Sequence, residues 1–519
     1  MRLSLLILTL IAACTAAAQG PDSVQVRVFG AAGEETATAL WVDDMGCVMA
    51  GETTSDITMA VGQAQWAPGG PTGRKGFIAI LDTALDHQWS FAFAGDPDAP
   101  LGAPSALAVR DVARTADSTA WVLYDAPRAG AWRGHLMGVH PEDGITAQFA
   151  LGGSGPDAVA TCGLVPAGGS TFIVVGHRIS GTTPDALPSG VMAGLWTGSN
   201  SASPGWGPIT GAESMEAIAA DWWNDTLYVA VHRPEMPDAP SAVLLVTTED
   251  GVPAVAGTAA IADPAITLTD ITAGPLGVAW SGTLASPDGT EDAVFGKLAA
   301  APDLADPTSW SHAWIMETVS TLDNPGRAIL WTGVILQCAA RTQTAGAGGA
   351  GALVQRRSGE TGAWFGAHVF GGLDDEDPRA LAWDAEGRLL VAGSSNSWTG
   401  LTAGNGSTDA VLFRSPTTQL VANLPYATAE ATVNVDLAFV GLPDGPDPTA
   451  VATTRTVLAL APGSALPVDP GTPWSMFSPS GALLARGSGP TSTPDFAGLW
   501  RLETGSIPHL SSRWIWVMD

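Results

Sequence analysis

The chain is poor in charge, lysine and cysteine, and these scarcities exclude several classes of protein. Only 14% of the 519 residues are charged, and 51 acidic residues outnumber 22 basic ones, giving a formal net charge of −29. Lys75 and Lys297 are the only lysines. Because a surface of this sign repels nucleic-acid phosphates and anionic lipid headgroups, neither is expected as a partner.

Long apolar runs and catalytic motifs are missing as well. After the N-terminal segment no stretch reaches the roughly 18 apolar residues of a transmembrane helix, so none is expected in the mature chain. The sequence has no His-Glu-x-x-His, Gly-x-Ser-x-Gly, Walker or Cys-x-x-Cys motif, and only three tyrosines. A non-enzymatic protein is therefore favoured over an enzyme.

The N-terminus has the pattern of an export signal. A basic residue at position 2 precedes the apolar segment Leu3–Ala13, which is too short to span a bilayer. A small-residue site predicts cleavage after Ala18, and hence a signal peptide over residues 1–18. The alternative is a lipobox at residues 11–14, with lipid anchoring at Cys14. The first is favoured because the lipobox would leave an unusually short signal, and both predict a secreted or cell-surface protein.

Cleavage after Ala18 leaves an odd number of cysteines that lie far apart in the sequence: Cys47, Cys162 and Cys338. Such spacing does not indicate a disulfide framework. Each cysteine lies in or beside an apolar, strand-like segment. We therefore expect three small, buried apolar side chains.

The abundant features indicate an all-β protein with internal repeats. Apolar residues make up 46% of the chain, and 62 glycines and 38 prolines provide turns between short strands. The pattern of the segment 39–55 returns closely at 380–395, register included, with an Asp/Gly-type turn between two apolar strands. A second strand pattern follows it seven times, starting near residues 76, 134, 191, 241, 292, 351 and 409.

A period near 55 residues with four short strands predicts a β-propeller over residues 24–425. Seven blades of four antiparallel strands are expected, with six or eight as alternatives, because a lone four-stranded sheet cannot bury both its apolar faces. Two segments compete to close the ring. One is Val24–Gly30, which precedes the first repeat but resembles the last strand of a blade, and the other is Gln419–Ala422.

The repeats resemble a known family. Val28–Ser55 and Val369–Ser397 look like the SBBP-type β-propeller repeats of secreted bacterial proteins, and Gln148–Gly181 does so less closely. The resemblance implies a surface protein whose propeller has no catalytic role.

A different pattern follows the repeats. Residues 426–452 are predicted to form a connecting β segment, and residues 453–519 a small C-terminal β-sandwich. The order of strands and turns over 453–519 is similar to the C-terminal sorting domain of type IX secretion substrates, although Pro462-Gly463 replaces the usual Asn-Pro turn and the terminal lysines are absent. The resemblance implies export through the type IX secretion machinery.

One acidic loop is a candidate metal site. Asp374, Asp375 and Asp377 follow a Gly-Gly pair, and clustered carboxylates can supply the oxygen ligands of Ca²⁺. The spacing is not that of an EF-hand, and an acidic turn in an acidic protein needs no ion. No other cofactor is expected.

Three hypotheses about function follow. The favoured one is an exported, non-enzymatic propeller that acts as a binding or adhesion scaffold for a glycan or a protein. The alternative is a propeller-type carbohydrate-active enzyme, a hydrolase or lyase, with carboxylates at the propeller axis. The third is a structural spacer without a ligand. The tryptophans at repeated strand positions are interpreted as packing between blades rather than as sugar-stacking platforms.

Overall fold

The computed structural model describes the strands and adjoining turns of the chain. The described residues are 25–29, 33–54, 73–93, 107–128, 131–151, 158–168, 171–181, 187–197, 205–249, 252–261, 263–287, 289–298, 312–317, 323–343, 349–371, 374–397, 408–415, 434–435, 457–460, 473–477, 483–488, 498–506 and 509–517. The expected signal peptide over residues 1–18, Cys14, the rival closing strand at 419–422 and nearly all of the segment 426–452 lie outside them. No helix in the described part of the chain is long and apolar enough to cross a membrane.

The regular elements of the described residues are β-strands. Those before residue 416 are β1 (Gln25–Phe29), β2 (Glu35–Asp43), β3 (Gly46–Thr53), β4 (Lys75–Leu81), β5 (His87–Phe93), β6 (Ala108–Arg114), β7 (Ala120–Arg128), β8 (Ala131–His140), β9 (Gly144–Ala150), β10 (Ala158–Gly168), β11 (Thr171–Ile179), β12 (Pro188–Trp196), β13 (Gly205–Glu213), β14 (Glu216–Trp223), β15 (Thr226–His232), β16 (Ser241–Glu249), β17 (Val252–Ile261), β18 (Ile266–Gly274), β19 (Gly277–Ala285), β20 (Glu291–Leu298), β21 (His312–Glu317), β22 (Gly326–Thr332), β23 (Ile335–Thr342), β24 (Gly351–Ser358), β25 (Trp364–Phe370), β26 (Glu376–Trp383), β27 (Leu389–Ser395) and β28 (Asp409–Arg414).

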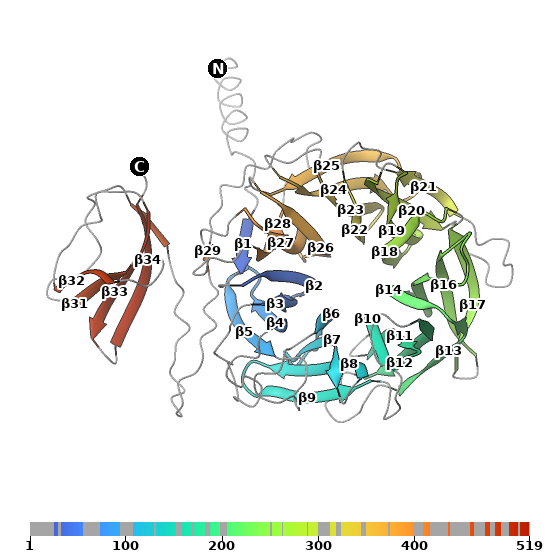
Figure 1. The fold of residues 1–519 in the computed structure, drawn as a ribbon, viewed down its shortest axis with the longest axis horizontal. Coiled ribbons are helices and arrows are strands. Elements are labelled where there is room, and N and C mark those ends of the chain that lie inside the picture. The colour runs from blue at the N-terminus through green and yellow to red at the C-terminus, as the bar shows by residue number, and fades with distance from the viewer. Residues whose placement is uncertain are drawn as a thin grey trace, which may run out of the picture.

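These strands form four-stranded antiparallel units that we call blades. Among the described residues, blades 1 to 6 are the consecutive groups of four from β2–β5 to β22–β25, and blade 7 consists of β26, β27, β28 and β1. A single parallel bridge between Thr210 and Ala254 links blades 3 and 4 into one eight-stranded sheet. The blades stand around a common axis with their first strands innermost (Figure 1). This arrangement is a propeller-like all-β fold.

The ring closes on itself. The first strand of each blade contacts the first strand of the next, and β26 of blade 7 contacts β2 of blade 1. Seven clusters of buried apolar side chains each join two neighbouring blades. Between blades 2 and 3, for example, the fully buried Trp121 and Trp196 meet edge to face with ring centroids 4.2 Å apart. The core of the ring is therefore distributed over the interfaces between blades.

The N-terminal strand supplies the missing fourth strand of blade 7. β1 pairs antiparallel with β28, in a register that sets Val26 opposite Phe413 and Val28 opposite Val411. Val26 and Val28 face the cluster shared with blade 6, whereas Phe29 packs into the cluster shared with blade 1. Of the two segments that the sequence left as rivals, Val24–Gly30 thus takes the closing position through its described residues, 25–29, while 419–422 lies outside the described residues.

The C-terminal strands form one described sheet. β30 (Val457–Leu460), β31 (Pro473–Phe477), β32 (Leu483–Ser488), β33 (Gly498–Ser506) and β34 (His509–Val517) are ordered β30-β34-β33-β31-β32. β30 runs parallel to β34 and the other pairs are antiparallel. The described residues show a single layer, so the two layers of the expected sandwich are not shown. The remaining strand, β29 (Asn434–Val435), pairs in parallel with β1.

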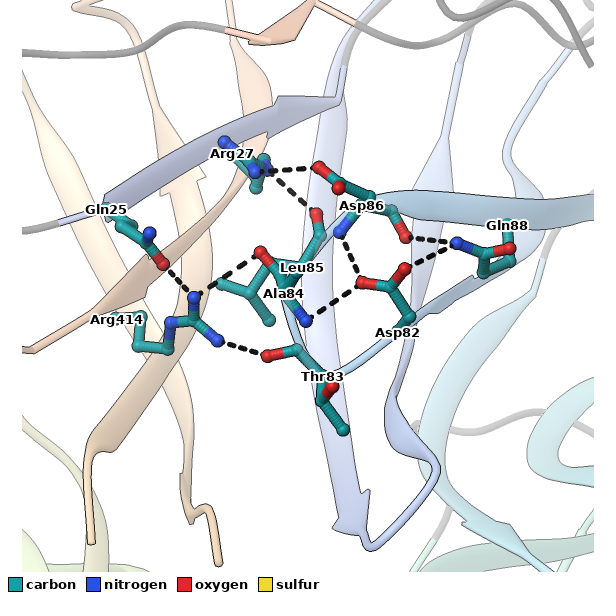
Figure 2. Close-up of polar contacts among 9 residues, drawn as sticks. All are labelled: Gln25, Arg27, Asp82, Thr83, Ala84, Leu85, Asp86, Gln88 and Arg414. Atoms are coloured by element: carbon teal, nitrogen blue, oxygen red, sulfur yellow. Dashed lines mark hydrogen bonds and ion pairs between the residues drawn. The ribbon is translucent and has the colours of Figure 1, made fainter. Parts of the chain in front are cut away.

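Two arginines of blade 7 hold a turn of blade 1 (Figure 2). Arg414 on β28 donates from Nη1 to the carbonyl of Thr83 at 2.6 Å and from Nη2 to the carbonyl of Ala84 at 3.3 Å. Arg27 on β1 donates from Nε to the carbonyl of Leu85 at 2.8 Å and pairs with Asp86 at 3.1 Å. Together these contacts fasten the last blade to the first.

The turn itself is shaped to present those carbonyls. Leu85 adopts a positive φ of 65° although it is not glycine, and its side chain is buried between blades 7 and 1. Asp82 accepts the backbone N–H groups of Ala84 and Asp86, each at 2.9 Å, and the side-chain amide of Gln88 at 2.8 Å. The strained conformation thus persists because side-chain packing and hydrogen bonds fix it from both sides.

We predict that Arg414→Met lowers the free energy of unfolding of the ring by about 2 kcal/mol, because it removes charge-assisted hydrogen bonds from two carbonyls. Arg74→Met is the matched control: Arg74 is 57% exposed and pairs with Glu52 at 2.9 Å, so its loss should cost less than about 1 kcal/mol. Urea unfolding followed by tryptophan fluorescence measures both. Equal midpoints for the two variants would show that the arginine contacts do not hold the ring closed.

Candidate functional site

Each innermost strand carries a β-bulge at the same place. In every blade the pairing between the first and second strands skips one residue near the start of the first strand. A bulge adds an unpaired residue, bends the strand and redirects a side chain. The skipped residues, in order of the blades, are Thr38, Arg110, Cys162, Ile218, Thr269, Arg327 and Arg379.

All seven bulge residues line one central cavity. The cavity has a volume of about 770 Å³, and its lining also contains threonine hydroxyls and the carboxyl groups of Glu34, Glu52, Asp111, Glu216 and Asp270. None of its described lining residues is Phe, Tyr, Trp or Lys, and His177 supplies the one imidazole among them. The cavity is therefore a polar, hydroxyl- and charge-lined site of a size suited to a small molecule or a chain end.

The cavity opens toward the face of the ring on which β2 begins and β3 ends. Its lining includes Thr36 at the start of β2, Thr53 at the end of β3 and Arg74 just before β4. The two-residue turn that joins β2 and β3 lies at the opposite ends of these strands, and neither of its residues lines the cavity.

The three arginines at bulge positions are held by carboxylates, as is Arg74, the fourth arginine of the lining, which pairs with Glu52. Arg110 donates from Nε to Asp125 at 2.8 Å, and Asp125 is fully buried. Asp377 accepts from Nε of Arg327 at 2.8 Å and from Nη2 of Arg379 at 2.6 Å. These pairs fix the guanidinium groups without covering them, because 40%, 23% and 43% of the side chains of Arg110, Arg327 and Arg379 stay exposed.

Two carboxyl groups of the cavity wall bind neighbouring blades together. Asp111 accepts the N–H of Val112 at 2.8 Å and that of Leu164, in the next blade, at 2.7 Å. Asp270 does the same with Ile271 at 2.8 Å and with Ile329 of the next blade at 2.9 Å. Each aspartate uses one oxygen for its own strand and the other for the neighbouring blade.

Asp221 makes a related link. Its carboxyl group accepts the backbone N–H of Trp222 and that of Ala273 in the next blade, each at 2.7 Å. Asp221 lies three residues after its bulge residue, whereas Asp111 and Asp270 directly follow theirs. Burial among backbone groups raises the pKa of Asp111 and of Asp221 to about 6, and that of Asp270 to about 7. The charges of Asp221 and Asp111 add to the shift at Asp270. The three carboxyls thus titrate in the range from weakly acidic to neutral pH.

Two further titratable groups near the bulges, His177 and Cys162, are kept neutral at neutral pH. Burial, together with the neighbouring charge of Arg110, lowers the pKa of His177 to about 4. Burial raises the pKa of the Cys162 thiol well above its usual range, so a thiolate nucleophile is not provided. Cys47 and Cys338 are buried, as expected, whereas Cys162 is only half-buried because it lines the cavity.

The aspartates of the calcium hypothesis do not gather around one point that the structure describes. Asp377 binds the two cavity arginines, while Asp375 accepts the N–H of Ala350 at 2.7 Å and pairs with Arg341 at 3.2 Å. The backbone N–H of Asp374 donates to the hydroxyl of Ser397 at 2.9 Å. Among the residues that the structure describes, no group of three or more His, Cys, Asp or Glu side chains is placed to hold a metal ion. Calcium binding here stays a prediction.

The tryptophans serve mainly in packing. Trp196 and Trp280 are fully buried, and Trp41 packs against two of the clusters between blades. Trp223 and Trp383 are exceptions, with 43% and 38% of their surfaces exposed, but neither lines the cavity.

Comparison with known proteins bears on the fold alone. No family model matches the chain, neither for SBBP repeats nor for a type IX sorting domain, and no curated protein matches it. Solved structures that it resembles include Raptor of Chaetomium thermophilum, at 7% identity and a TM-score of 0.43. That match covers 77% of this chain and 29% of the Raptor chain. A protein of unknown function from Dyadobacter fermentans DSM 18053 is 11% identical, with a TM-score of 0.41 over 77% of this chain and all of that one. The phage phi92 endosialidase is 9% identical, with a TM-score of 0.38 over 77% and 70% of the two chains.

The sequence analysis missed the cavity residues, although a signal for them exists. In four repeats the bulge residue stands directly before an alanine that opens the apolar segment, as Thr38 does before Ala39 and Arg379 before Ala380, whereas Asp or Gly intervenes in the other three. Aligning the repeats on that segment places the seven positions in one column. Their convergence on the axis depends on the bulge, which the sequence pattern does not reveal.

Titration of the inter-blade aspartates predicts a fall in stability as pH rises. Their pKa values are about 6 to 7 in the folded chain and about 4 when unfolded. The folded state therefore binds more protons between these values, and the free energy of unfolding decreases as pH rises from about 4 to 7. His177 and His368, with pKa values lowered to about 4, act in the opposite direction below pH 6.5.

Asp270→Asn isolates the contribution of one aspartate. Both oxygens of Asp270 accept backbone N–H groups, so the NH₂ group of the asparagine would face one of these donors without an acceptor. The free energy of unfolding of the variant at pH 5 should therefore be about 1–3 kcal/mol lower than that of the wild type. The difference should shrink by pH 8, because only the wild type loses the stabilising proton. Urea unfolding at both pH values measures it, and a difference that does not change with pH would contradict the raised pKa of Asp270.

Proposed function

We propose that this chain is an exported, non-enzymatic binding or adhesion scaffold, and that the central cavity of its seven-bladed β-propeller receives the ligand. The observation that carries the proposal is that seven bulges direct one side chain from each blade toward a single polar cavity. Packing alone does not require polar residues at those positions. Their convergence favours recognition of a ligand over a purely structural ring.

Export is the second part of the proposal. The signal-like residues 1–18, the SBBP-like repeats and the sorting-domain-like residues 453–519 support secretion through the type IX machinery, followed by release or display on the cell surface. The net charge of −29 suits an extracellular surface that stays soluble in salt. Lipid anchoring at Cys14 is the alternative form of the same localisation.

A carbohydrate-active enzyme is the second candidate. Carboxyl groups with raised pKa values, Asp111 and Asp270, line the same cavity, and such groups can act as general acids. Against catalysis, both oxygens of each accept backbone N–H groups of two blades. A hydrogen-bonding role in holding the blades together already explains their burial.

The test compares ligand binding by the wild-type chain with binding by a variant in which a large side chain fills the cavity. The mature chain is applied to an array of glycans and extracellular proteins, alongside Cys162→Trp, which places an indole in the cavity. Met45→Trp is the control, because Met45 is exposed in the β2–β3 turn, away from the cavity. We expect the control to retain binding and Cys162→Trp to lose at least about tenfold in affinity, provided that circular dichroism shows both to be folded.

The other outcomes discriminate between the hypotheses. Unchanged binding by Cys162→Trp would place the ligand site outside the cavity, and a wild-type chain that binds nothing would favour the structural spacer. Release of reducing ends or unsaturated products from array polysaccharides, lost in Asp270→Asn, would favour the enzyme.

A further inference from the structure

Arginine is concentrated at the bulge positions. Three of the seven bulge residues, Arg110, Arg327 and Arg379, are arginines, in a chain with 22 basic residues among 519. The chain thus departs from its acidic composition at the positions that face the axis. Arg327 and Arg379 are supplied by adjacent blades, so their guanidinium groups approach the cavity from one side.

The carboxylate partners orient these arginines rather than bury them. Asp377 uses Oδ1 for Nε of Arg327 and Oδ2 for Nη2 of Arg379, so one carboxylate fixes two side chains. A guanidinium has five N–H donors in a planar fork, and these ion pairs engage only one edge of each. The exposed fractions of 23% and 43% leave the rest of each fork at the cavity wall.

Three of the five carboxyl groups that line the cavity are engaged by other groups of the protein. Glu52 pairs with Arg74 at 2.9 Å and accepts the N–H of Val109 at 3.1 Å. The oxygens of Asp111 and Asp270 accept backbone N–H groups of two blades. Glu34, at the start of blade 1, and Glu216, in blade 4, complete the acidic lining, and neither belongs to blade 6 or 7, which supply Arg327 and Arg379.

Resting on the function proposed above, we infer that the cavity selects a small hydroxylated molecule or chain end bearing an oxyanion, a carboxylate, sulfate or phosphate, which Arg327 and Arg379 bind jointly. Charge-assisted forks from arginine to an oxyanion are short and strong. Threonine hydroxyls of the lining, including those of Thr38 and Thr269, suit the hydroxyl groups of the same ligand. The described lining has no Phe, Tyr or Trp, the side chains on which sugar rings usually stack, and this disfavours a ligand held by stacking.

The experiment is calorimetric titration of the mature chain with matched small probes. D-Glucuronate carries the carboxylate, methyl glucoside is its neutral counterpart, inorganic sulfate and phosphate represent the other oxyanions, and putrescine is a cation. We expect glucuronate to bind, methyl glucoside to bind at least about tenfold more weakly, and putrescine not to bind. Sulfate and phosphate should compete with glucuronate.

Variants locate the effect. Arg327→Gln and Arg379→Gln should each weaken glucuronate binding by about 10- to 100-fold, the equivalent of one or two charge-assisted hydrogen bonds. Arg341→Gln is the control. The side chain of Arg341 is 29% exposed and pairs with Asp375, as the cavity arginines pair with carboxylates, but it does not line the cavity. Arg110 is left intact because its removal would take away the charged partner of the fully buried carboxyl group of Asp125 and so destabilise the fold. Thermal unfolding establishes that each variant is folded.

Each contrary result has a distinct meaning. Equal binding of methyl glucoside and glucuronate, or binding of putrescine, would overturn the oxyanion preference while leaving the cavity as a binding site. Glucuronate binding that survives both arginine substitutions would overturn the assignment to Arg327 and Arg379. No binding of any probe would overturn the inference, whereas the proposed scaffold role is judged separately by the array and its cavity-filling variant.

Discussion

A four-stranded sheet with two apolar faces cannot exist alone in water, and the rest of this structure follows from that constraint. Each blade buries both faces by packing against two neighbours, and in the described residues every one of the seven interfaces has its own apolar cluster. A row of such sheets ends in two uncovered faces, which only a closed ring removes. Closure is therefore a condition of stability, and β1 provides it by completing blade 7 from the other end of the chain.

The same ring creates the candidate site. Seven first strands surround the axis, and a bulge in each turns one side chain into the space between them. Because the bulges occur at one level, residues as distant in sequence as Thr38 and Arg379 share a cavity. Five of the seven positions carry threonine or arginine, so the scaffold holds a specific set of polar groups at the cavity, while Cys162 and Ile218 also pack against clusters between blades. The residues that pack the blades and most of those that line the cavity are different residues, but the strands that the packing brings together determine where the cavity residues lie.

The fold was accessible from the sequence because its signals are local. The repeat of Ala39–Ser55 at Ala380–Ser395, the turn chemistry and the alternation of apolar residues all act within one blade, and they predicted the four-stranded units. The closing strand was left open between residues 24–30 and 419–422, because strand pairing across the two ends of a ring is not a local signal. The C-terminal sandwich was predicted from a weaker pattern, and the described strands form one layer.

The site was not accessible because its contacts are long-range. Asp377 was grouped with Asp374 and Asp375 as a calcium candidate on the basis of adjacency, yet its partner Arg327 lies 50 residues away on another blade. Ion pairs of this kind depend on which strands the ring brings together, and no local pattern specifies that. The bulge position in the repeat is the one feature from which these residues could have been found.

Amide hydrogen exchange of the closing strand tests the central claim most directly. If β1 completes blade 7, the amides of residues 25–29 that bond to β28 are protected to the same extent as those of β27, and they exchange together with residues 409–414. Mass spectrometry of peptides from the two ends of the ring measures this. Exchange of residues 25–29 at the rate of unprotected amides, while β27 and β28 remain protected, would contradict a ring closed by its N-terminal strand.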